Sequence, residues 1–306
     1  MNVMRRSMLT IADSGAIERA CRRSRLTRGL VDRFIAGETL DDALAAATRI
    51  HAQGMTTTLD LLGENVSTAD EAEKAVAAYV AILRAMRAAD LEPNISAKLT
   101  MLGLDLGDEV AQANMLAILA AAEDVDGFVR IDMEGSDYTD RTMRIFAEVH
   151  GRHPGRVGAV IQSYLRRAEA DARLTVELGA RVRLVKGAYA EPEDVAFQSG
   201  REVDDSFIAL MERLLDGGFY PAIATHDPAL ILATQTYAQR MGIPPDRFEF
   251  QMLYGVRRDE QARLAAAGYR MRVYVPFGTE WYPYFTRRIA ERPANAFFVL
   301  RQLVDR

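Results

Sequence analysis

Short runs of apolar, often β-branched residues alternate along the chain with longer segments in which apolar residues recur every three or four positions. The short runs predict buried strands, and the longer segments predict amphipathic helices. The predicted strands are 56–64, 94–100, 128–134, 157–164, 181–189, 220–226, 248–253 and 270–278. The predicted helices cover about 68–89, 108–122, 139–150, 165–179, a segment ending near 217, 228–241, 257–267 and 281–293. The pattern therefore contains eight successive strand–helix units.

Eight such units favour a closed (β/α)8 barrel, an α/β fold, over an open doubly wound sheet. Strands that alternate with helices pair in parallel through right-handed crossovers. The open sheet predicts a glycine-rich turn after an early strand, and neither G-x-G-x-x-G nor G-x-x-x-x-G-K-[ST] occurs in the chain. Residues 13–53 have a helical pattern throughout, with Thr39 as a candidate N-cap. We therefore expect an N-terminal helical arm over 1–53 and a barrel catalytic domain over 54–306.

Composition and charge exclude several classes of protein. Of the 306 residues, 49% are hydrophobic and 26% are charged, as in an ordinary globular protein, and the net charge of −5 argues against a nucleic-acid partner. The single cysteine, Cys21, excludes an internal disulfide framework, and no segment is apolar for long enough to span a membrane. The start of the chain is a poor secretion signal because Asp13 interrupts its apolar run. We expect a cytoplasmic protein, at most peripheral on the inner face of the membrane.

Polar side chains gather toward the carboxyl ends of the predicted strands, where the chemistry of α/β barrels is found. They are Glu64, Lys98, Asp132, Glu134, Gln162, Tyr164, Arg183, Lys186, Tyr189, Thr225, His226, Asp227 and Tyr274. Charged groups in strands are costly to bury unpaired, so a ring of them indicates mutual pairing or a bound ligand. Lysine is otherwise rare, with three lysines among the 38 basic residues, and two of the three lie in this ring.

The helix predicted over 281–293 carries a polar stripe where a buried helix would carry an apolar one. Tyr284, Arg287, Arg288 and Glu291 fall at positions i, i+3, i+4 and i+7. A solvated face with Arg–Glu pairs is the simpler interpretation for a surface helix. However, two adjacent guanidinium forks are suited to gripping a carboxylate or a phosphate. Because this helix follows a ring of polar strand ends, its stripe favours a clamp for a small anionic substrate.

Motifs for several other chemistries are missing from the chain. G-x-S-x-G and H-E-x-x-H do not occur, and His150 and His153 are interpreted as solvated histidines at a helix end, so no metal site is expected. Two enzyme classes remain on the residues alone. One is a Schiff-base lyase or aldolase that uses Lys98 or Lys186, and the other is a cofactor enzyme that clamps an acid beside its cofactor. A non-catalytic binding protein explains the buried charges least well.

Longer motifs occur in a consistent order between residues 64 and 293. They are SAKLTMLG (96–103), RIDMEG (130–135), VIQSYLRR (160–167), RLVKGAYAE (183–191), ATHDP (224–228), FQMLYG (250–255), YVPFG (274–278) and YFTRRIAERP (284–293). With this set the chain resembles the proline dehydrogenase family, in particular its bacterial monofunctional members. RLVKGAY and YxxRRxxERP are the most specific of these motifs. The chain has no room for the aldehyde dehydrogenase half that some bacterial relatives carry.

The resemblance implies a distorted (β/α)8 barrel with a C-terminal lid helix over its mouth. It implies non-covalently bound FAD and the oxidation of L-proline to Δ1-pyrroline-5-carboxylate, the first step of proline catabolism to glutamate. It also implies that electrons pass to a membrane quinone. A separate pyrroline-5-carboxylate dehydrogenase would then act downstream.

The resemblance also implies roles for individual residues. Asp132 and Arg183 would be catalytic, with Arg183 beside the flavin N5. Lys98, Arg287 and Arg288 would bind the proline carboxylate, and Glu64 would pair with Arg287 and hold it in position. The walls around the proline ring would be Tyr189, Leu253, Tyr274 and Tyr284. The flavin-binding positions would be Met133, Gln162, Arg183, Lys186, Gly187, Ala188, Thr225 and His226.

Overall fold

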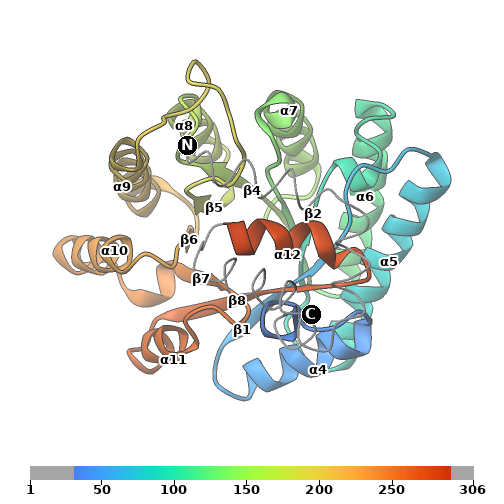
Figure 1. The fold of residues 1–306 in the computed structure, drawn as a ribbon, viewed down its shortest axis with the longest axis horizontal. Coiled ribbons are helices and arrows are strands. Elements are labelled where there is room, and N and C mark those ends of the chain that lie inside the picture. The colour runs from blue at the N-terminus through green and yellow to red at the C-terminus, as the bar shows by residue number, and fades with distance from the viewer. Residues whose placement is uncertain (1–30, 291–306) are drawn as a thin grey trace, which may run out of the picture.

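The computed structural model describes residues 31–290, and within them eight parallel strands form a closed barrel (Figure 1). The strands follow one another around the barrel in sequence order. They are β1 (Thr56–Leu61), β2 (Asn94–Ala97), β3 (Phe128–Ile131), β4 (Val157–Gln162), β5 (Arg181–Val185), β6 (Ala222–Ala224), β7 (Glu249–Leu253) and β8 (Arg270–Phe277). Strand β8 pairs with β1 along the whole length of β1, from Thr56 opposite Arg272 to Leu61 opposite Phe277. This pairing confirms the predicted barrel and excludes the open sheet.

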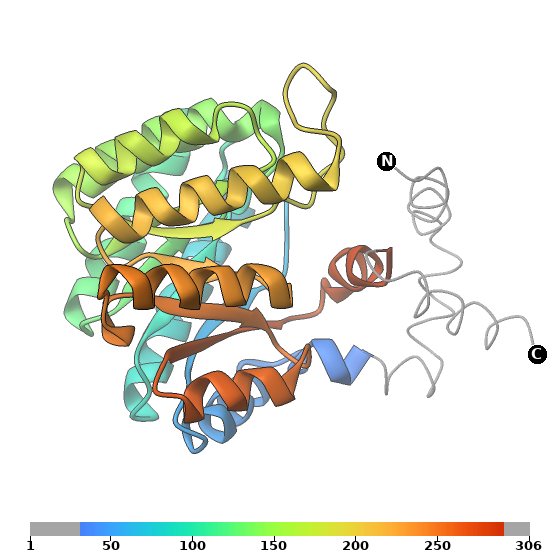
Figure 2. The same cartoon turned by 90° about the vertical axis from the view of Figure 1, so that its left-hand side faces the viewer.

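Helices between successive strands form the outer layer of the barrel (Figures 1 and 2). They are α5 (Ala69–Ala88), α6 (Asp108–Asp124), α7 (Ser136–Arg152), α8 (Ala168–Glu177), α9 (Gly200–Gly217), α10 (Pro228–Met241) and α11 (Arg258–Ala266). Local sequence sets where several of them begin. Thr68 caps α5 in a reciprocal capping box with Glu71, and Asp227 followed by Pro228 starts α10.

Two helices make the barrel irregular. Helix α4 (Leu40–His51), which precedes the first strand, packs against β8 and β1 on the outside of the barrel. Helix α12 (Trp281–Ala290), which follows the last strand, instead lies beyond the strand ends and across the barrel mouth (Figures 1 and 2). The distorted barrel with a lid helix is therefore present. Thr39 caps α4 as predicted, while residues 1–30 of the predicted arm lie outside the described residues, so the division at residue 53 stays a prediction.

All the strands except β7 end earlier than the sequence pattern predicts. The segment expected as strand 181–189 ends at Val185, because Gly187 has φ of +116°, a conformation that leaves the extended region. The segment expected as 94–100 ends at Ala97 and continues into the 3₁₀ helix η1 (Thr100–Leu102). The polar residues at these ends therefore lie in loops that border the mouth.

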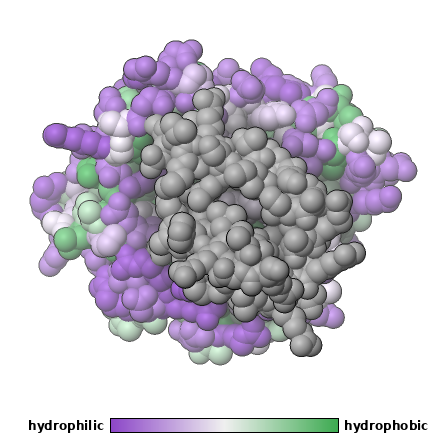
Figure 3. All heavy atoms as spheres, viewed as in Figure 1, coloured by the Kyte–Doolittle hydropathy of each residue, from purple (hydrophilic) through white to green (hydrophobic). Residues whose placement is uncertain are grey.

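The packing of the outer layer follows from its amphipathic helices. Their inner faces pack on the strands in one continuous apolar core, while the face of the molecule shown in Figure 3 is mainly hydrophilic around its rim. A second apolar cluster joins α12 to the segment before α4 and includes Ile35, Trp281, Tyr284 and Phe285. Within residues 31–290 no helix combines the length and the apolar character needed to cross a membrane.

Candidate active site

A cavity of about 500 Å³ opens at the carboxyl ends of the barrel strands. Most residues predicted from the sequence line it, namely Lys98, Asp132, Met133, Gln162, Arg183, Lys186, Gly187, Ala188, Tyr189, Thr225, His226, Leu253, Tyr274 and Tyr284. Tyr284 comes from α12, so the lid helix contributes to the wall of the cavity. This is the end of the barrel at which α/β-barrel enzymes hold their catalytic groups.

Arg183, Asp132 and Tyr274 form a connected group in the cavity wall. Arg183 Nη1 donates to Asp132 Oδ1 at 2.5 Å, and the Tyr274 hydroxyl donates to Asp132 Oδ2 at 2.7 Å. The Arg183 guanidinium also lies over the Tyr274 ring, with 5.0 Å between Cζ and the ring centroid. Arg183 is 5% exposed. Three residues from β5, β8 and the end of β3 are thereby fixed relative to one another.

Lys98 is buried in the wall of the same cavity, close to the carboxylate of Asp60. Its Nζ is 3.5 Å from Asp60 Oδ1, and Asp60 is 1% exposed. Burial alone would lower the pKa of Lys98, but the negative charges of Asp60 and Asp132 outweigh burial and raise this pKa above its ordinary value. Lys98 is therefore a permanent cation at the cavity, suited to an anionic group of a ligand.

Lys186 is held by two carboxylates at the edge of the cavity. Its Nζ lies 2.5 Å from Asp204 Oδ1 and 2.9 Å from Asp227 Oδ2. Burial opposes its charge, but the hydrogen bonds to Asp204 and Asp227 outweigh burial and raise the pKa of Lys186. Neither lysine of the site has the lowered pKa that a Schiff-base nucleophile requires.

Two features of the cavity fit a planar cofactor that carries hydrogen-bonding edges. Gln162 is buried, and its Oε1 has no hydrogen-bond partner among the described residues. Gly187 comes so close to Tyr164 that an added Cβ would lie 2.3 Å from the Tyr164 ring. The φ of +116° and this close contact both require glycine, which lets the backbone at position 187, part of the cavity lining, pack against Tyr164. A buried amide oxygen without a partner at Gln162 and a glycine in the cavity lining at position 187 are features that a flavin ring would use.

Hydrogen bonds fix the ends of β6 and β7 at the same cavity. His226 Nε2 accepts from the Leu253 backbone N–H at 2.9 Å, and Thr225 Oγ1 accepts from the Asp227 N–H at 3.1 Å. Gln261 Nε2 donates to the Leu253 carbonyl at 3.0 Å. Because these bonds tie side chains to backbone, the loops that carry Thr225, His226 and Leu253 have a defined shape.

The predicted carboxylate clamp is described only in part. Glu64 follows β1 and is half-buried, near enough to Lys98 to contribute to the raised pKa of the lysine. Arg287 and Arg288 lie on α12, but their side chains are outside what the structure describes. The pairing of Glu64 with Arg287 and the grip of both arginines on a carboxylate therefore stay predictions.

The structure adds three residues that the sequence did not single out. Asp60 and Gln251 line the cavity, and Ser96 Oγ accepts from Arg183 Nη2 at 3.1 Å. Asp60 and Ser96 lie in parallel register on β1 and β2. The available signal was a polar residue inside an apolar strand an even number of positions before the predicted end, four for Asp60 and Ser96 and two for Gln251, a spacing that keeps side chains on the same face.

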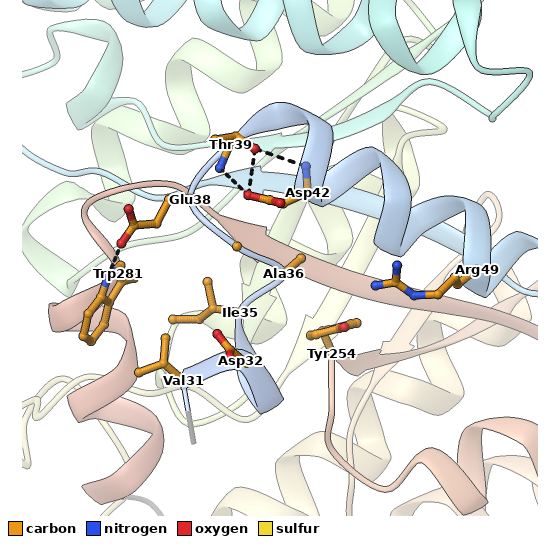
Figure 4. Close-up of a pocket in the computed structure, with 11 residues that line it drawn as sticks. Val31, Asp32, Ile35, Ala36, Glu38, Thr39, Asp42, Arg49, Tyr254 and Trp281 are labelled. Carbon is orange, nitrogen blue, oxygen red and sulfur yellow. Dashed lines mark hydrogen bonds between the residues drawn. The ribbon is translucent and has the colours of Figure 1, made fainter. Parts of the chain in front are cut away.

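A second cavity, of about 610 Å³, lies between the start of α4 and the start of α12 (Figure 4). Its described lining is Val31, Asp32, Ile35, Ala36, Gly37, Glu38, Thr39, Asp42, Arg49, Tyr254 and Trp281, none of them a predicted site residue. Several of its polar groups stabilise the fold. Glu38 Oε1 accepts from Trp281 Nε1 at 3.0 Å, and Asp42 is engaged by the Thr39 hydroxyl at 2.7 Å. We therefore place the chemistry in the barrel mouth.

Comparison with known proteins agrees with this placement. The chain is 42% identical over 274 residues to "Proline dehydrogenase 1" of Bacillus subtilis, a match that covers 90% of each chain. It is 38% identical over 304 residues to "Proline dehydrogenase" of Deinococcus radiodurans, which covers 98% of this chain and 97% of the relative. The family model described as proline dehydrogenase matches residues 43–301.

A solved structure extends the comparison to the fold. Proline utilization A (PutA) from Bdellovibrio bacteriovorus, inactivated by N-propargylglycine, superposes with a TM-score of 0.82 at 26% identity. The match covers 95% of this chain and 35% of that one, so this chain spans about a third of the solved PutA protein. The family match and the full-length relatives together show that the chain belongs to the proline dehydrogenase family.

Proposed function

We propose that this proline dehydrogenase oxidises L-proline to Δ1-pyrroline-5-carboxylate at the barrel mouth, with FAD held non-covalently as its cofactor. The observation that carries the proposal is the convergence of Arg183, Asp132, Tyr274 and the cationic Lys98 on one cavity, which also contains the unpartnered Gln162 oxygen. Such a set of groups suits a small amino acid beside a planar cofactor. The reaction itself removes two electrons and two protons across the C5–N bond of proline.

Residues of the chain would bind and orient the substrate. Lys98 supplies a positive charge for the proline carboxylate, and we propose that Arg287 and Arg288 complete the clamp from the lid helix. Leu253, Tyr274 and Tyr284 offer the ring an apolar wall. A clamp at the carboxylate and a wall at the ring restrict the substrate to one orientation. Holding two reactants in a productive orientation lowers the barrier to their reaction.

Other residues would hold the cofactor. Bound FAD supplies the acceptor for the two electrons that leave proline. Gln162, Gly187 and Arg183 are proposed to contact its ring, together with Met133, Lys186, Ala188, Thr225 and His226 at the same cavity. Lid helix α12 restricts the access of water to this space, which strengthens every electrostatic contact within it.

The destination of the electrons and of the product is also a proposal. A membrane quinone would reoxidise the cofactor, and a separate pyrroline-5-carboxylate dehydrogenase would consume the product. The much longer "Bifunctional protein PutA" of Escherichia coli matches this chain at 28% identity over only 24% of its length. Its name and length are in keeping with a second activity that this chain would leave to another enzyme.

The visible spectrum of the purified protein tests the proposal. We expect flavin absorption bands that bleach when L-proline is added without oxygen and return when a soluble quinone is supplied. A colourless protein that sodium borohydride links covalently to a carbonyl substrate would support the Schiff-base alternative instead. The raised pKa of both Lys98 and Lys186 speaks against that alternative.

A further inference from the structure

The guanidinium of Arg183 is connected to a deeper layer of buried polar side chains on β7 and β8. Arg183 Nε donates to Gln251 Oε1 at 2.6 Å, and Gln251 Nε2 donates to Glu249 Oε1 at 2.5 Å. Arg272 Nε donates to both oxygens of Glu249, at 3.0 and 3.1 Å. None of the four side chains belongs to a residue more than 5% exposed. A continuous chain of buried hydrogen bonds therefore runs from the cavity wall into the barrel interior.

The two neighbours of Gln251 leave its amide only one orientation. Arg183 has donors and no acceptor, whereas an ionised carboxylate such as Glu249 has acceptors and no donor. The amide oxygen must then face Arg183 and the amide nitrogen must face Glu249, as observed. A reversed amide would place its NH2 group against the N–H of Arg183, and its oxygen against the carboxylate oxygen of Glu249. The ionised Glu249 therefore fixes the Gln251 amide with its oxygen toward Arg183.

Arg272 keeps the carboxylate of Glu249 ionised. Burial alone would raise the pKa of Glu249, but the charge and hydrogen bonds of Arg272 outweigh burial and lower this pKa to about 2. Arg272 is fixed in turn, because its Nη1 donates to the Thr57 carbonyl at 2.8 Å and its Nη2 donates to Glu92 at 2.9 Å. Glu249 therefore stays ionised at any pH at which an enzyme of this kind works.

We propose that Gln251 and Glu249 are positioning residues that hold the Arg183 guanidinium in the orientation required for the bound flavin. This inference rests on the proposed function, in which Arg183 contacts the flavin. Three of the five N–H groups of Arg183 are used by Gln251, Asp132 and Ser96. The other two N–H groups lie in the plane of the guanidinium, and the three contacts fix the orientation of that plane. A cation held in one place stabilises the negative charge that a flavin gains on reduction without reorganising at the moment of reaction.

The test uses Gln251→Met, which keeps the length of the side chain and removes its amide. We expect kcat to fall about tenfold while KM for proline changes less than about twofold, because the carboxylate clamp lies elsewhere. We also expect the flavin to become harder to reduce, by about tenfold in the reduction equilibrium, which for two electrons is about 30 mV of midpoint potential. Glu249→Gln, which keeps the shape but removes the acceptor-only partner, should shift the potential in the same direction by a smaller amount.

Thr58→Val is the matched control. It removes another buried hydrogen bond of the barrel, from Thr58 Oγ1 to Asn94 Oδ1 at 2.7 Å, which does not involve Arg183. It should lower Tm without changing the flavin potential. If Gln251→Met binds flavin and lowers Tm, but leaves the potential and kcat at the wild-type values, the positioning role is wrong and the chain of bonds only supports the fold. If the wild-type protein binds no flavin, the proposed function fails and this inference fails with it.

Discussion

Tyr274 is the residue at which the polar and aromatic parts of the site meet. Its hydroxyl donates to Asp132, and its ring lies under the Arg183 guanidinium. Burial raises the pKa of Tyr274 well above its ordinary value, and the charge of Asp132 adds to this effect. The phenol therefore stays protonated and remains a donor, and Asp132 is held between two donors, one on each oxygen.

Removal of the Tyr274 hydroxyl should impair catalysis more than stability. In Tyr274→Phe the ring remains, but Asp132 loses one donor, and a hydrogen bond to a charged group contributes about 1.5–3 kcal/mol. We expect kcat/KM for proline to fall about tenfold to a hundredfold, measured by steady-state kinetics. Tyr138→Phe is the control, because Tyr138 makes a similar bond to Asp105, at 3.1 Å, on the surface. Equal losses in the two variants would contradict the role of Tyr274.

Lys98 offers a second test at the same scale. As a buried cation beside Asp60 it can bind a carboxylate, but it is a poor nucleophile. In Lys98→Met we expect KM for proline to rise about tenfold or more, since about 1.4 kcal/mol of charge pairing with the substrate is lost. A carboxylic acid that resembles proline but lacks its amine should bind the variant more weakly by a similar factor. If its affinity is unchanged, the substrate carboxylate does not lie near Lys98.

The sequence predicts the ring of polar residues but not the layer beneath it. Residues at strand ends were found because apolar runs stop there, as with Asp132. Gln251 and Arg272 escaped because they lie inside strands, where only the register of neighbouring strands shows which polar groups meet. Glu249 on β7 binds Arg272 on β8 diagonally, since the strand register pairs Glu249 with Arg270, and the two residues are 23 positions apart in the chain. Such pairings are set by the closed barrel and not by any local pattern.

At the scale of elements, α12 depends on a small apolar cluster for its position over the mouth. Trp281 packs edge-on against Tyr282 and Phe285, and its indole nitrogen donates to Glu38. The same cluster contains Tyr284, which lines the cavity. The docking of the helix and the shape of the site are therefore coupled.

We expect Trp281→Leu to raise KM for proline. The change removes a large buried side chain, and truncation of such a side chain costs roughly 3 kcal/mol or more. The lost packing weakens the contact that holds α12 over the mouth. KM should rise about fivefold or more, and trypsin should cleave α12 faster than in the wild type. Thr286→Ala, on the same helix, removes only a bond to the Pro283 carbonyl and should change neither. A loss of Tm with KM and cleavage unchanged would show that the packing of Trp281 does not set the position of α12 at the binding site.

Periodicity alone predicted the order of the elements, whereas the placement of α12 over the mouth was predicted only through the family resemblance. Periodicity predicts where helices and strands occur, and the short loops around them follow. The same periodicity predicts α4 and α12 equally as helices, but α4 covers β8 and β1 while α12 leaves the barrel wall. Which of the two helices packs on the barrel wall depends on which one fills the space beside β8 and β1. The sequence of either segment alone does not show this.

At the scale of the whole molecule, closure of the barrel is supported by an ion pair between its last two strands. Glu249 on β7 binds Arg272 on β8, and Arg272 also reaches the Thr57 carbonyl on β1 and Glu92 before β2. These contacts tie the first and last strands together from inside. A buried pair of this kind is costly to break, because removal of one partner leaves the other charge uncompensated.

This pair predicts how stability depends on pH. The pKa of Glu249 is lowered from 4.5 to about 2 in the folded protein, so its stabilising contribution is fully present above pH 4.5 and is lost as the pH falls toward 2. A shift of this size corresponds to roughly 3 kcal/mol. Wild type should therefore exceed Glu249→Gln in free energy of unfolding at about pH 7, and urea denaturation should show the difference shrinking toward about pH 3.

Glu202→Gln separates this effect from general acid denaturation. Glu202 is exposed at the start of α9, where a hydrogen bond from the Ser199 hydroxyl to its carboxylate lowers its pKa, so it also titrates in the acid range but carries no buried charge. Its substitution should change the pH dependence of unfolding little, since exposed charges contribute little to stability. Protonation of Glu249 at low pH gives the wild type a neutral side chain of about the same shape as that of the glutamine variant, so the two free energies of unfolding should approach each other. A constant gap across the acid range would mean that Arg272 does not hold Glu249 ionised, and that the barrel closes on some other contact.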